Sequence, residues 1–486
     1  MTNKSSNKPA SKPIKFGTDG WRGVVADDYT FDNVRAVAQA TAEWLKRDKQ
    51  ASKGVVIGFD TRFLSGTFAG LVAEVMAGNG IQTTLTSAFC PTPALSWAVR
   101  DKQAGGGVMI TASHNPARWN GFKVKPHYGG SAPEEITREI ENTIPAVQAA
   151  DRVQSIPLGE GEAQGLIERV DVRAPYLKTL GGFVDLPKIQ EAGWHVLIDP
   201  MYGSAQGWLS RLVQGGSTSV QEIHNERNPS FPGLRAPEPI AANLKESMDL
   251  IKEGGFDVGL SMDGDADRFG LIDENGRFIT QLQTFALLVY YFLEVREERG
   301  PIVRSVTMTR MVDRLGELYD CPVHETQVGF KHLGAKMMET NALIAGEESG
   351  GSAFRGHIPE RDGLLAGMFI LDFMTRTGKR PSELLADLYE KVGPHEYDRV
   401  DVTIRPDERD AIEAQVQANE PDTIAGFKVV GRDEIDGYRF NLEGGWWLLL
   451  RFSGTEPLLR IYAEMPTSEQ VQDALVQGQE IAGISL

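Results

Sequence analysis

The chain has 486 residues, of which 41% are hydrophobic and 24% are charged. Its length predicts roughly three or four domains rather than a single hydrophobic core. Acidic residues outnumber basic residues by 67 to 50, giving a formal net charge of −17. Such a surface repels nucleic acid and anionic membranes, so we expect neither as a partner. A small molecule is expected instead, and an anionic one would need a local cluster of arginine and lysine.

The N-terminal segment and the cysteines indicate the cellular compartment. Residues 1–13 combine lysine with serine, asparagine and proline, which predicts a disordered tail rather than a secretory signal. The apolar run at 284–295 is shorter than the ~20 residues of a membrane helix. Cys90 and Cys321 are far apart in the sequence and support neither a disulfide framework nor a thiolate metal site. Together these features predict a cytoplasmic protein.

The first predicted unit alternates short apolar runs with segments of helical period. Residues 54–59 and 81–85 are predicted strands, and residues 65–78 are a predicted helix that ends in glycine. A predicted helix at 92–100 leads into a strand at 107–110. This β-α-β-α order predicts a parallel-rich sheet covered by helices.

Two further cycles of the same kind follow. The second has strands at 194–199 and 257–261 and a helix from about residue 204. The third has strands at 301–303, 323–327 and 342–345 and helices at 311–319 and 330–338. Residue identity among the three units is too low to define a sequence repeat.

The C-terminal segment has a different pattern. Strands at 446–452 and 458–464 flank a tight turn at 453–457, and a helix follows from Ser468. We therefore expect a separate antiparallel α+β domain after the third cycle, and we interpret the acidic segment 151–165 as a linker. The predicted domains are 14–160, 161–279, 280–393 and 394–486, preceded by the tail at 1–13.

A candidate nucleophile follows the strand at 107–110. The sequence of residues 111–116 is TASHNP, and the residue before a proline is kept out of the helical region. We therefore expect Ser113 to face solvent at the tip of the strand, where its hydroxyl could carry a covalent group. An ordinary exit from a strand fits these six residues equally well.

Three carboxylates alternate in the segment DGDADR. In an extended loop Asp263, Asp265 and Asp267 would lie on one side and repel one another unless a hard cation lies between them. A calcium EF-hand is excluded because Arg268 replaces the required glycine and because the flanks are strand-like, with a hairpin turn predicted at 275–276. Three protein oxygens leave room for a phosphate oxygen, which favours Mg²⁺. A solvated acidic turn is the alternative.

Two later segments suit a phosphorylated sugar. Residues 453–457, with Arg451 before them and Arg460 after them, offer hydroxyls, amides and guanidinium groups to a phosphate. The segment GEESGG at 346–351 offers carboxylates and a hydroxyl to sugar hydroxyls. A plain hairpin and a solvated loop would have similar sequences.

Further cations accompany these segments. Arg22 lies in the glycine-rich FGTDGWRG, Lys123 ends NGFK, and Lys331 ends GFK. Lone lysines usually face solvent, so their importance depends on the other motifs. The histidines show no metal-ligand spacing such as H-E-x-x-H, and there is no G-x-S-x-G segment.

Five of these segments, in order over nearly the whole chain, resemble the α-D-phosphohexomutase family of phosphoglucomutases and phosphomannomutases. They are FGTDGWRG, TASHNP, DGDADR, GEESGG and RFSGTEP. The resemblance implies a heart-shaped protein around a central cleft. It would have three related α/β domains with mixed, mostly parallel sheets and a C-terminal α+β domain of TATA-binding-protein-like fold.

The resemblance also implies a role for each site residue. Ser113 would carry the phosphoryl group, and Asp263, Asp265 and Asp267 would hold Mg²⁺ against it. The remaining catalytic residues would be Arg22 and Arg268 for charge stabilisation, His114 and Lys123 beside the phosphoryl group with Lys123 as general base, and Lys331 as a second acid/base. Glu347 and Ser349 would read the sugar hydroxyls, and the other phosphate would be held by Arg451, Ser453, Gly454, Thr455 and Arg460.

The implied reaction interconverts hexose 1-phosphate and hexose 6-phosphate. The Ser113 phosphate passes to the substrate, and the resulting 1,6-bisphosphate, which is also the expected activator, turns end for end before it returns the other phosphate. We expect glucose phosphate as the main substrate, with mannose phosphate tolerated. The alternatives are a glucose 1,6-bisphosphate synthase, a phosphoserine-dependent phosphatase and a silent sugar-phosphate-binding protein. The sequence leaves open the choice of hexose, retention of the bisphosphate, a monomer or homodimer, the phosphorylation state of Ser113, and regulation.

Overall fold

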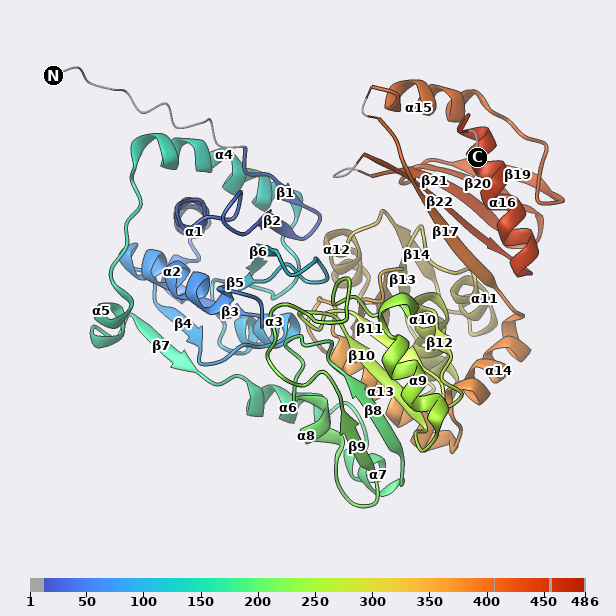
Figure 1. Ribbon diagram of the computed structural model, residues 1–486, viewed down its shortest axis with the longest axis horizontal. Helices are drawn as coiled ribbons and strands as arrows, with labels where there is room; N and C mark the ends of the chain where they lie inside the picture. Colours follow the sequence, from blue (N-terminus) through green and yellow to red (C-terminus); the bar gives the residue numbers. More distant parts are fainter. Residues whose placement is uncertain (1–12, 406, 454–456, 485–486) are drawn as a thin grey trace. The chain divides into compact units, whose positions relative to one another are not determined.

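The computed structural model describes residues 13–405, 407–453 and 457–484 (Figure 1). The predicted tail at 1–13 lies outside these residues except for Pro13. The chain divides into two units. The first contains the described residues up to Ile279 together with Gly351–Thr375, and the second contains Thr280–Gly350 together with the described part of Arg376–Leu486.

A seven-stranded mixed sheet forms the first α/β domain. Its order is β1 (Phe16–Gly17), β2 (Gly20–Val24), β6 (Trp119–Pro126), β5 (Gly106–Ile110), β3 (Val55–Phe59), β4 (Thr83–Thr86) and β7 (Ile167–Val170). Strands β5, β3, β4 and β7 run parallel, whereas β6, β2 and β1 join by antiparallel pairs. The predicted parallel-rich sheet is therefore confirmed, with an antiparallel edge.

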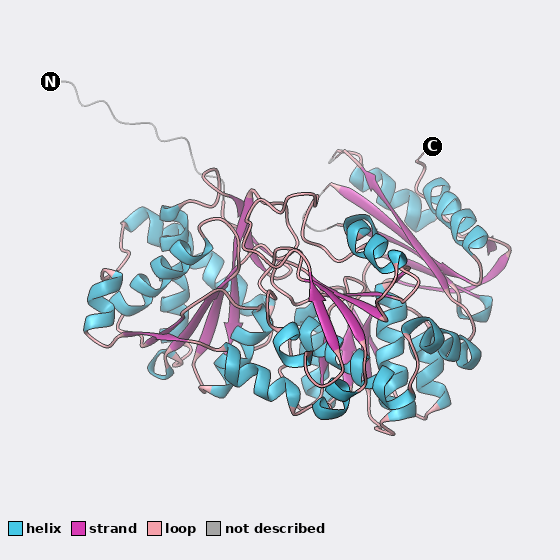
Figure 2. Cartoon of the chain, turned by 60° about the horizontal axis from the view of Figure 1, so that its bottom comes forward, coloured by secondary structure: helices cyan, strands magenta, loops and turns pink. Residues whose placement is uncertain are grey.

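Helices flank the strands of this domain, as Figure 2 shows. Helix α1 (Phe31–Arg47) packs against both α2 (Ser65–Gly78) and α4 (Glu134–Ala150), and the short η1 (Ala51–Lys53) follows α1. Helix α3 (Thr92–Asp101) packs on β3 and β5. Helix α3 approaches closely because glycines lie beneath it. A Cβ on Gly107 would lie 2.6 Å from a methyl carbon of Val99, and one on Gly58 would lie 2.8 Å from a methyl carbon of Leu95.

The segment at 151–165 is not a plain linker. It contains α5 (Leu158–Ala163), which packs on α2, and the amide of Ile156 donates to the carbonyl oxygen of Glu74 over 3.2 Å. The chain then enters β7, so the first sheet includes residues beyond the predicted boundary at 160. The acidic composition of residues 151–165 indicated a solvated linker. A largely exposed helix with one buried edge can have the same composition, so composition alone did not distinguish the two.

A second mixed sheet has the order β12 (Phe278–Ile279), β11 (Phe269–Ile272), β10 (Val258–Met262), β8 (His195–Asp199) and β9 (Ser219–Glu222). Strands β8, β9 and β10 are parallel, and β11 and β12 are antiparallel around the predicted turn at 275–276. Its helices are α6 (Arg173–Gly181), α7 (Leu186–Glu191), α8 (Leu209–Val213), η2 (Ala241–Asn243) and α9 (Lys245–Glu253). The helix predicted from residue 204 begins at Leu209, because residues 201–208 form turns in which Met201 and Tyr202 have positive φ.

The first unit also contains β16 (Ser352–Phe354) and most of α13 (Gly363–Thr377). In the second unit, β13 (Ile302–Ser305) pairs in parallel with β14 (Val323–Thr326) and β15 (Ile344–Gly346). The helices there are α10 (Gln281–Tyr290), the π-helical η3 (Tyr291–Val295), α11 (Met311–Leu318), α12 (Phe330–Thr340) and α14 (Pro381–Val392). The third predicted cycle is confirmed, with small differences at the ends of its elements.

The C-terminal domain is an antiparallel sheet with helices, as predicted. Its order is β17 (Glu396–Thr403), β22 (Leu458–Met465), β21 (Trp447–Phe452), β20 (Tyr438–Leu442), β19 (Phe427–Asp433) and β18 (Thr423–Ile424), with η4 (Glu443–Gly445) before β21. Helices α15 (Arg409–Ala418) and α16 (Ser468–Ile481) cover one face (Figure 1), where Leu448, Leu450 and Ile461 are buried. On the opposite face Leu449 and Tyr462 pack against Val306 of the third domain.

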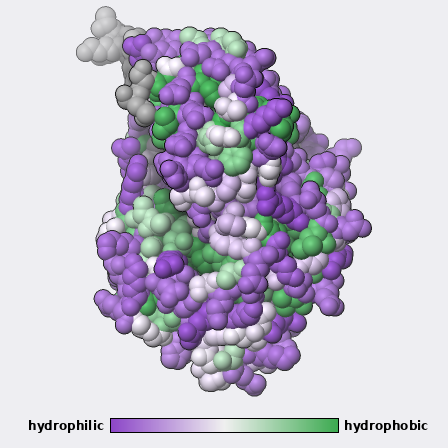
Figure 3. Space-filling view, turned by 90° about the vertical axis from the view of Figure 1, so that its right-hand side faces the viewer, coloured by the Kyte–Doolittle hydropathy of each residue, from purple (hydrophilic) through white to green (hydrophobic). Residues whose placement is uncertain are grey.

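The surface agrees with the charged composition. Hydrophilic residues cover most of the face drawn in Figure 3, with hydrophobic residues scattered among them. Among the described helices, none is both long and apolar enough to cross a membrane. The structure thus confirms three mixed-sheet domains and an antiparallel C-terminal domain, while the heart shape and central cleft stay predictions.

Candidate active site

Ser113 is buried rather than presented to solvent, so that expectation is wrong. Its exposed fraction is 1%, and its φ of +50° lies in the left-handed region. The buried Arg62 holds the loop from one side by donating to the carbonyl oxygens of Ser113 and Asn115, each over 2.5 Å. Gly264 packs against the same carbonyl oxygen of Ser113, since a Cβ there would lie 2.4 Å from it. The Ser113 hydroxyl donates to Asp263 Oδ2 over 2.7 Å.

The three aspartates converge as predicted, but by a different route. They lie between β10 and β11 and are fully buried, which excludes a solvated acidic turn. One carboxylate oxygen of each lies within 4.8 Å of the others. The loop is a tight turn rather than an extended segment: the amide of Ala266 donates to the Asp263 carbonyl oxygen over 3.0 Å, and Ala266 has a φ of +59°.

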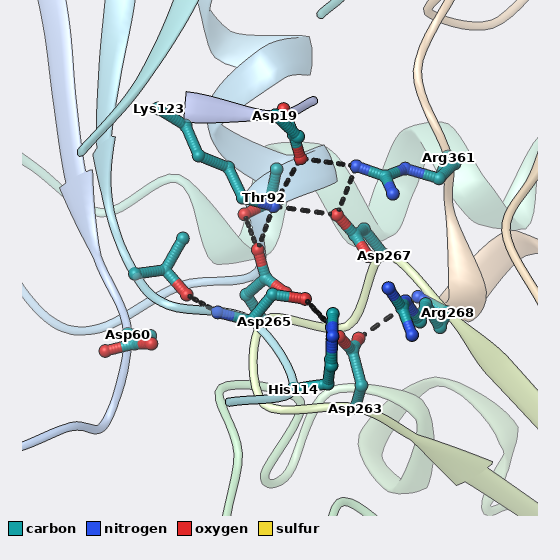
Figure 4. A network of polar contacts seen from close by, with 12 residues as sticks. Asp19, Asp60, Thr92, His114, Lys123, Asp263, Asp265, Asp267, Arg268 and Arg361 are labelled. Atoms are coloured by element: carbon teal, nitrogen blue, oxygen red, sulfur yellow. Dashed lines mark hydrogen bonds and ion pairs between the residues drawn. The ribbon is translucent and has the colours of Figure 1, made fainter. Parts of the chain in front are cut away.

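Two buried cations lie against this cluster (Figure 4). Lys123 Nζ lies 2.8 Å from Asp265 Oδ2, 2.9 Å from Asp267 Oδ2 and 2.8 Å from Asp19 Oδ2. Arg361 lies 2.8 Å from Asp267 Oδ2 and 2.5 Å from Asp19 Oδ2. Carboxylates and cations therefore alternate through a volume from which solvent is excluded.

This packing shifts the pKa values in opposite directions. Burial, followed by repulsion from Asp265 and Asp267, raises the pKa of Asp263 well above its usual range. Burial also opposes ionisation of Asp265, but the contact with Lys123 outweighs it and lowers the pKa of that carboxyl. Burial disfavours the Lys123 ammonium, yet Asp19, Asp265 and Asp267 together raise its pKa. Lys123 therefore holds its proton firmly in this arrangement.

The donor set fits Mg²⁺. Asp265 Oδ1 and Asp267 Oδ1 are buried, and neither has a hydrogen-bond partner among the described residues. Buried carboxylate oxygens without partners are costly, and a hard divalent cation would satisfy them. The raised pKa of Asp263 also favours a cation site, because a bound cation would offset the repulsion from Asp265 and Asp267.

The remaining predicted residues of the first unit surround Ser113. His114 Nδ1 lies 3.2 Å from the Ser113 hydroxyl. Burial, then the charges of Arg268 and Arg22, lowers the pKa of His114 well below its usual range, so its ring is neutral. Arg22 lies on β2 and donates to the Asn115 side chain of the same loop. The amide of Arg268 donates to Asp263 Oδ1 over 3.1 Å, and its guanidinium pairs with Glu238 over 2.8 Å.

The other predicted residues belong to the second unit. Lys331 lies in the first turn of α12, and Glu347 and Ser349 follow β15, where the Ser349 hydroxyl donates to Glu347 over 2.7 Å. Ser453 is buried at the end of β21. Gly454 and Thr455 lie outside the described residues.

Arg451 and Arg460 lie directly opposite each other on β21 and β22. Like charges at such a cross-strand position destabilise a sheet unless an anion or carboxylates compensate them. Each has a carboxylate at its Nε side: Asp436 Oδ2 lies 2.9 Å from Arg451 Nε, and Asp401 Oδ2 lies 3.7 Å from Arg460 Nε. The pair places two guanidinium groups on adjacent strands, near the described residue Ser453.

Comparison with known proteins identifies the family. Domain families of phosphoglucomutase/phosphomannomutase match this chain in order: α/β/α domain I at residues 13–151, domain II at 174–276, domain III at 281–392 and the C-terminal domain at 413–477. The chain belongs to the phosphoglucomutase/phosphomannomutase family.

Individual relatives of the family agree over the full length. A phosphoglucomutase/phosphomannomutase of Thermococcus kodakarensis is 31% identical, over 95% of this chain and 97% of the relative. A phosphoglucosamine/phosphogalactosamine mutase of Sulfurisphaera tokodaii is 29% identical over 95% and 97%. A crystal structure from Thermus thermophilus, proposed as a phosphomannomutase, has a TM-score of 0.84 and 32% identity over 97% of this chain and 100% of that one.

Membership in the phosphoglucomutase/phosphomannomutase family makes the protein an enzyme, a phosphotransferase that acts as an isomerase. The family is magnesium-dependent, which agrees with the buried aspartates. The names of the relatives include mutases of amino sugars, so family membership alone leaves the hexose open.

The sequence analysis did not identify several residues that contact the aspartate cluster. Thr92, the first residue of α3, donates its hydroxyl to Asp265 Oδ2 over 2.5 Å. Asp19 lies within the FGTDGWRG segment, so it could have been found as the acid beside Arg22. Arg361 has no signal of its own, because only the fold brings the segment between β16 and α13 to the aspartates.

Proposed function

We propose that the protein interconverts hexose 1-phosphates and hexose 6-phosphates through phosphorylated Ser113 and a hexose 1,6-bisphosphate. The observation that carries this proposal is the buried hydroxyl of Ser113, which lies 2.7 Å from one of three clustered aspartates. Three buried carboxylates that repel one another are costly, and a serine that served only the fold would not require them beside it. Glucose phosphate is the proposed main substrate, with mannose phosphate tolerated.

The side chains of the first unit support phosphoryl transfer. Phosphoserine carries roughly −1.5 to −2 charges at neutral pH, so its neighbours must supply positive charge. Arg22, Arg268 and Lys123 supply it from the protein. Mg²⁺, held by Asp263, Asp265, Asp267 and a Ser113 oxygen, would neutralise the remaining charge of the phosphoryl group. Water has little access to this buried site, which protects the phosphoserine from hydrolysis.

Proton transfer can use groups on this chain. The Ser113 hydroxyl donates its proton to Asp263 Oδ2, and the neutral His114 ring lies 3.2 Å from the same hydroxyl, so His114 can take this proton once the hydroxyl turns toward Nδ1. Lys123 is the proposed general base for the substrate hydroxyl, and that role requires it to lose the proton that three carboxylates now stabilise. In its present arrangement Lys123 is a fixed positive charge that keeps its proton, so its role as a base requires the contacts with these carboxylates to change.

The second unit supports recognition of the sugar phosphate. The cross-strand pair of Arg451 and Arg460 suits a phosphate, and Glu347 with Ser349 suits adjacent sugar hydroxyls. The amino-sugar mutase among the relatives favours glucosamine phosphate as a second candidate substrate. A 1,6-bisphosphate synthase would use the same phosphoserine and would differ in releasing the bisphosphate.

One set of assays tests the proposal. Glucose, mannose and glucosamine 1-phosphates are supplied separately with Mg²⁺ and a trace of glucose 1,6-bisphosphate, and formation of each 6-phosphate is measured. We expect the fastest turnover with glucose 1-phosphate. Accumulation of free bisphosphate would indicate the synthase, whereas inorganic phosphate without any 6-phosphate would indicate a phosphatase and refute the mutase.

A further inference from the structure

One face of β17 carries alternating polar side chains at Tyr397, Arg399 and Asp401. Residues two apart on a strand project from the same face. The register with β22 places Tyr462 opposite Arg399 and Arg460 opposite Asp401. This is the face on which Tyr397 and Tyr462 pack with the third domain, so its side chains lie next to elements of that domain.

Glu348 reaches this face from the GEESGG segment. Its Oε1 accepts hydrogen bonds from the Tyr397 hydroxyl over 3.1 Å and from Arg399 Nη1 over 3.0 Å. The neighbouring acid behaves differently, because Glu347 accepts a hydrogen bond from Ser349 within the segment itself. Glu348 is therefore held by the C-terminal sheet.

The ion pairs continue from Glu348 to the proposed phosphate site. Arg399 Nε lies 2.9 Å from Asp401 Oδ1, and Asp401 Oδ2 lies 3.7 Å from Arg460 Nε. Acid and base alternate in the order Glu348, Arg399, Asp401, Arg460. We call these four residues the Glu348 chain.

The Glu348 chain is unsuited to a mainly stabilising role. The side chains of Arg399 and Asp401 are 37% and 35% exposed, and ion pairs that accessible contribute little to stability. Their geometry is nevertheless defined, because Arg399 uses different guanidinium nitrogens for Glu348 and for Asp401. A planar guanidinium that joins two carboxylates fixes the distance between them.

We propose that Glu348, acting through Arg399 and Asp401, positions Arg460 and so couples the phosphate site to the sugar-reading segment. The inference rests on the proposed function, in which Glu347 and Ser349 read hydroxyls and Arg460 holds phosphate. A hexose phosphate has a fixed distance between these groups, so a fixed spacing of their partners selects it. Glu348 is then a positioning residue that influences substrate binding without touching the sugar.

The test measures binding without turnover. Glu348→Gln, Arg399→Met and the double variant are made in a Ser113→Ala background, and glucose 6-phosphate binding is titrated by calorimetry. We expect each single variant to weaken binding about tenfold, and the double variant to be no weaker than the singles, because both break the same chain. The same variants with Ser113 intact should show KM raised by a similar factor and kcat within about twofold.

A matched control uses another ion pair of the same domain. Glu434 pairs with Arg432 over 3.0 Å, outside the Glu348 chain, and Glu434→Gln should leave binding and KM unchanged. Unchanged binding in the Glu348 and Arg399 variants would overturn the inference. So would losses that multiply in the double variant, or a loss equal to that of the Glu434 control.

The outcome separates this inference from the proposed function. A wild-type protein that isomerises hexose phosphates, combined with unchanged binding in the variants, rejects only the Glu348 chain. A wild-type protein that isomerises none of the tested hexose phosphates rejects the proposed function. In that case, glucose 6-phosphate binding that still depends on Glu348 would support the chain as a feature of a binding site.

Discussion

Ser113 is held in a conformation that a serine adopts only under constraint. Its left-handed φ, the bonds from Arg62 to its loop and the contact with Gly264 fix the hydroxyl at Asp263. Ser113→Ala removes one oxygen and none of these constraints. We expect isomerase activity to fall by at least about 10³-fold with little change in Tm, measured with a coupled assay and thermal unfolding. Exposed Ser230→Ala is the control, and turnover near the wild-type rate in S113A would remove Ser113 from the mechanism.

Asp263 destabilises the metal-free protein at neutral pH. A carboxyl whose pKa is higher in the folded than in the unfolded protein lowers the free energy of unfolding at high pH. This destabilisation decreases as the pH falls and disappears below the ordinary pKa of the carboxyl. Asp263→Asn keeps an acceptor for the Ser113 hydroxyl and removes the charge. With EDTA present, we expect its Tm at pH 7 to exceed that of wild type by about 2–4 °C, and the difference to vanish toward pH 4. Equal or lower Tm at pH 7 would contradict this explanation.

Mg²⁺ should affect the same two proteins differently. A ligand that binds only the folded state raises Tm, and Asp263→Asn lacks one of the proposed ligands. We expect millimolar Mg²⁺ to raise the Tm of wild type and to raise that of the variant much less. Thermal unfolding over a Mg²⁺ titration measures this, and equal shifts in both proteins would place the metal elsewhere.

Among the elements of the first unit, the loop after β5 and the loop between β10 and β11 meet through Gly264. A methyl group there would lie 2.4 Å from the Ser113 carbonyl oxygen, a contact that requires the loops to separate. We expect Gly264→Ala to lower activity about 10²-fold and to destabilise the protein by about 1–3 kcal/mol, measured by assay and urea denaturation. Gly159→Ala is the control, since nothing lies within 4 Å of a Cβ there. Equal behaviour of the two variants would show that close approach of these loops is unimportant.

The elements themselves were largely predictable, because their hydrophobic periods are local. The run at 54–59 and the glycine that closes the helix at 65–78 identify β3 and α2 within a residue. The segments at 151–165 and from residue 204 were misjudged, since polar turns and half-exposed helices have similar composition. Hydrophobic period alone cannot distinguish a polar turn from a half-exposed helix. The elements that each segment packs against decide which of the two forms.

Between whole domains, a buried ion network joins the third domain to the C-terminal domain. Glu325 on β14 pairs with Arg304 on β13 and with Arg439 on β20, each over 2.5 Å. Burial opposes ionisation of Glu325, but Arg439 and Arg304 outweigh it and lower its pKa to about 2. Such a carboxyl contributes stability above its ordinary pKa, and this contribution declines as the pH falls toward about 2.

Glu325→Gln tests this network. The substitution removes the carboxylate that two buried arginines share and leaves Arg304 with Asp313 and Arg439 with Asp433. We therefore expect a loss of about 1–3 kcal/mol in unfolding free energy at pH 7. The loss should be constant above about pH 5 and shrink at lower pH, as measured by urea denaturation. The ion pair of exposed Glu434 with partly buried Arg432 provides the control, and a loss no larger than that of Glu434→Gln would show that the network is dispensable.

Residue types and their order along the chain were sufficient to predict the α/β class, the antiparallel C-terminal domain, the phosphohexomutase family and the grouping of three aspartates. These properties depend on local period and on short motifs, which the sequence contains in full. The burial of Ser113, the contacts of Arg361 and Lys123 with the aspartates, and the Glu348 chain depended on the folded structure. They join residues far apart along the chain, and such contacts exist only when sheets and loops have packed and excluded water.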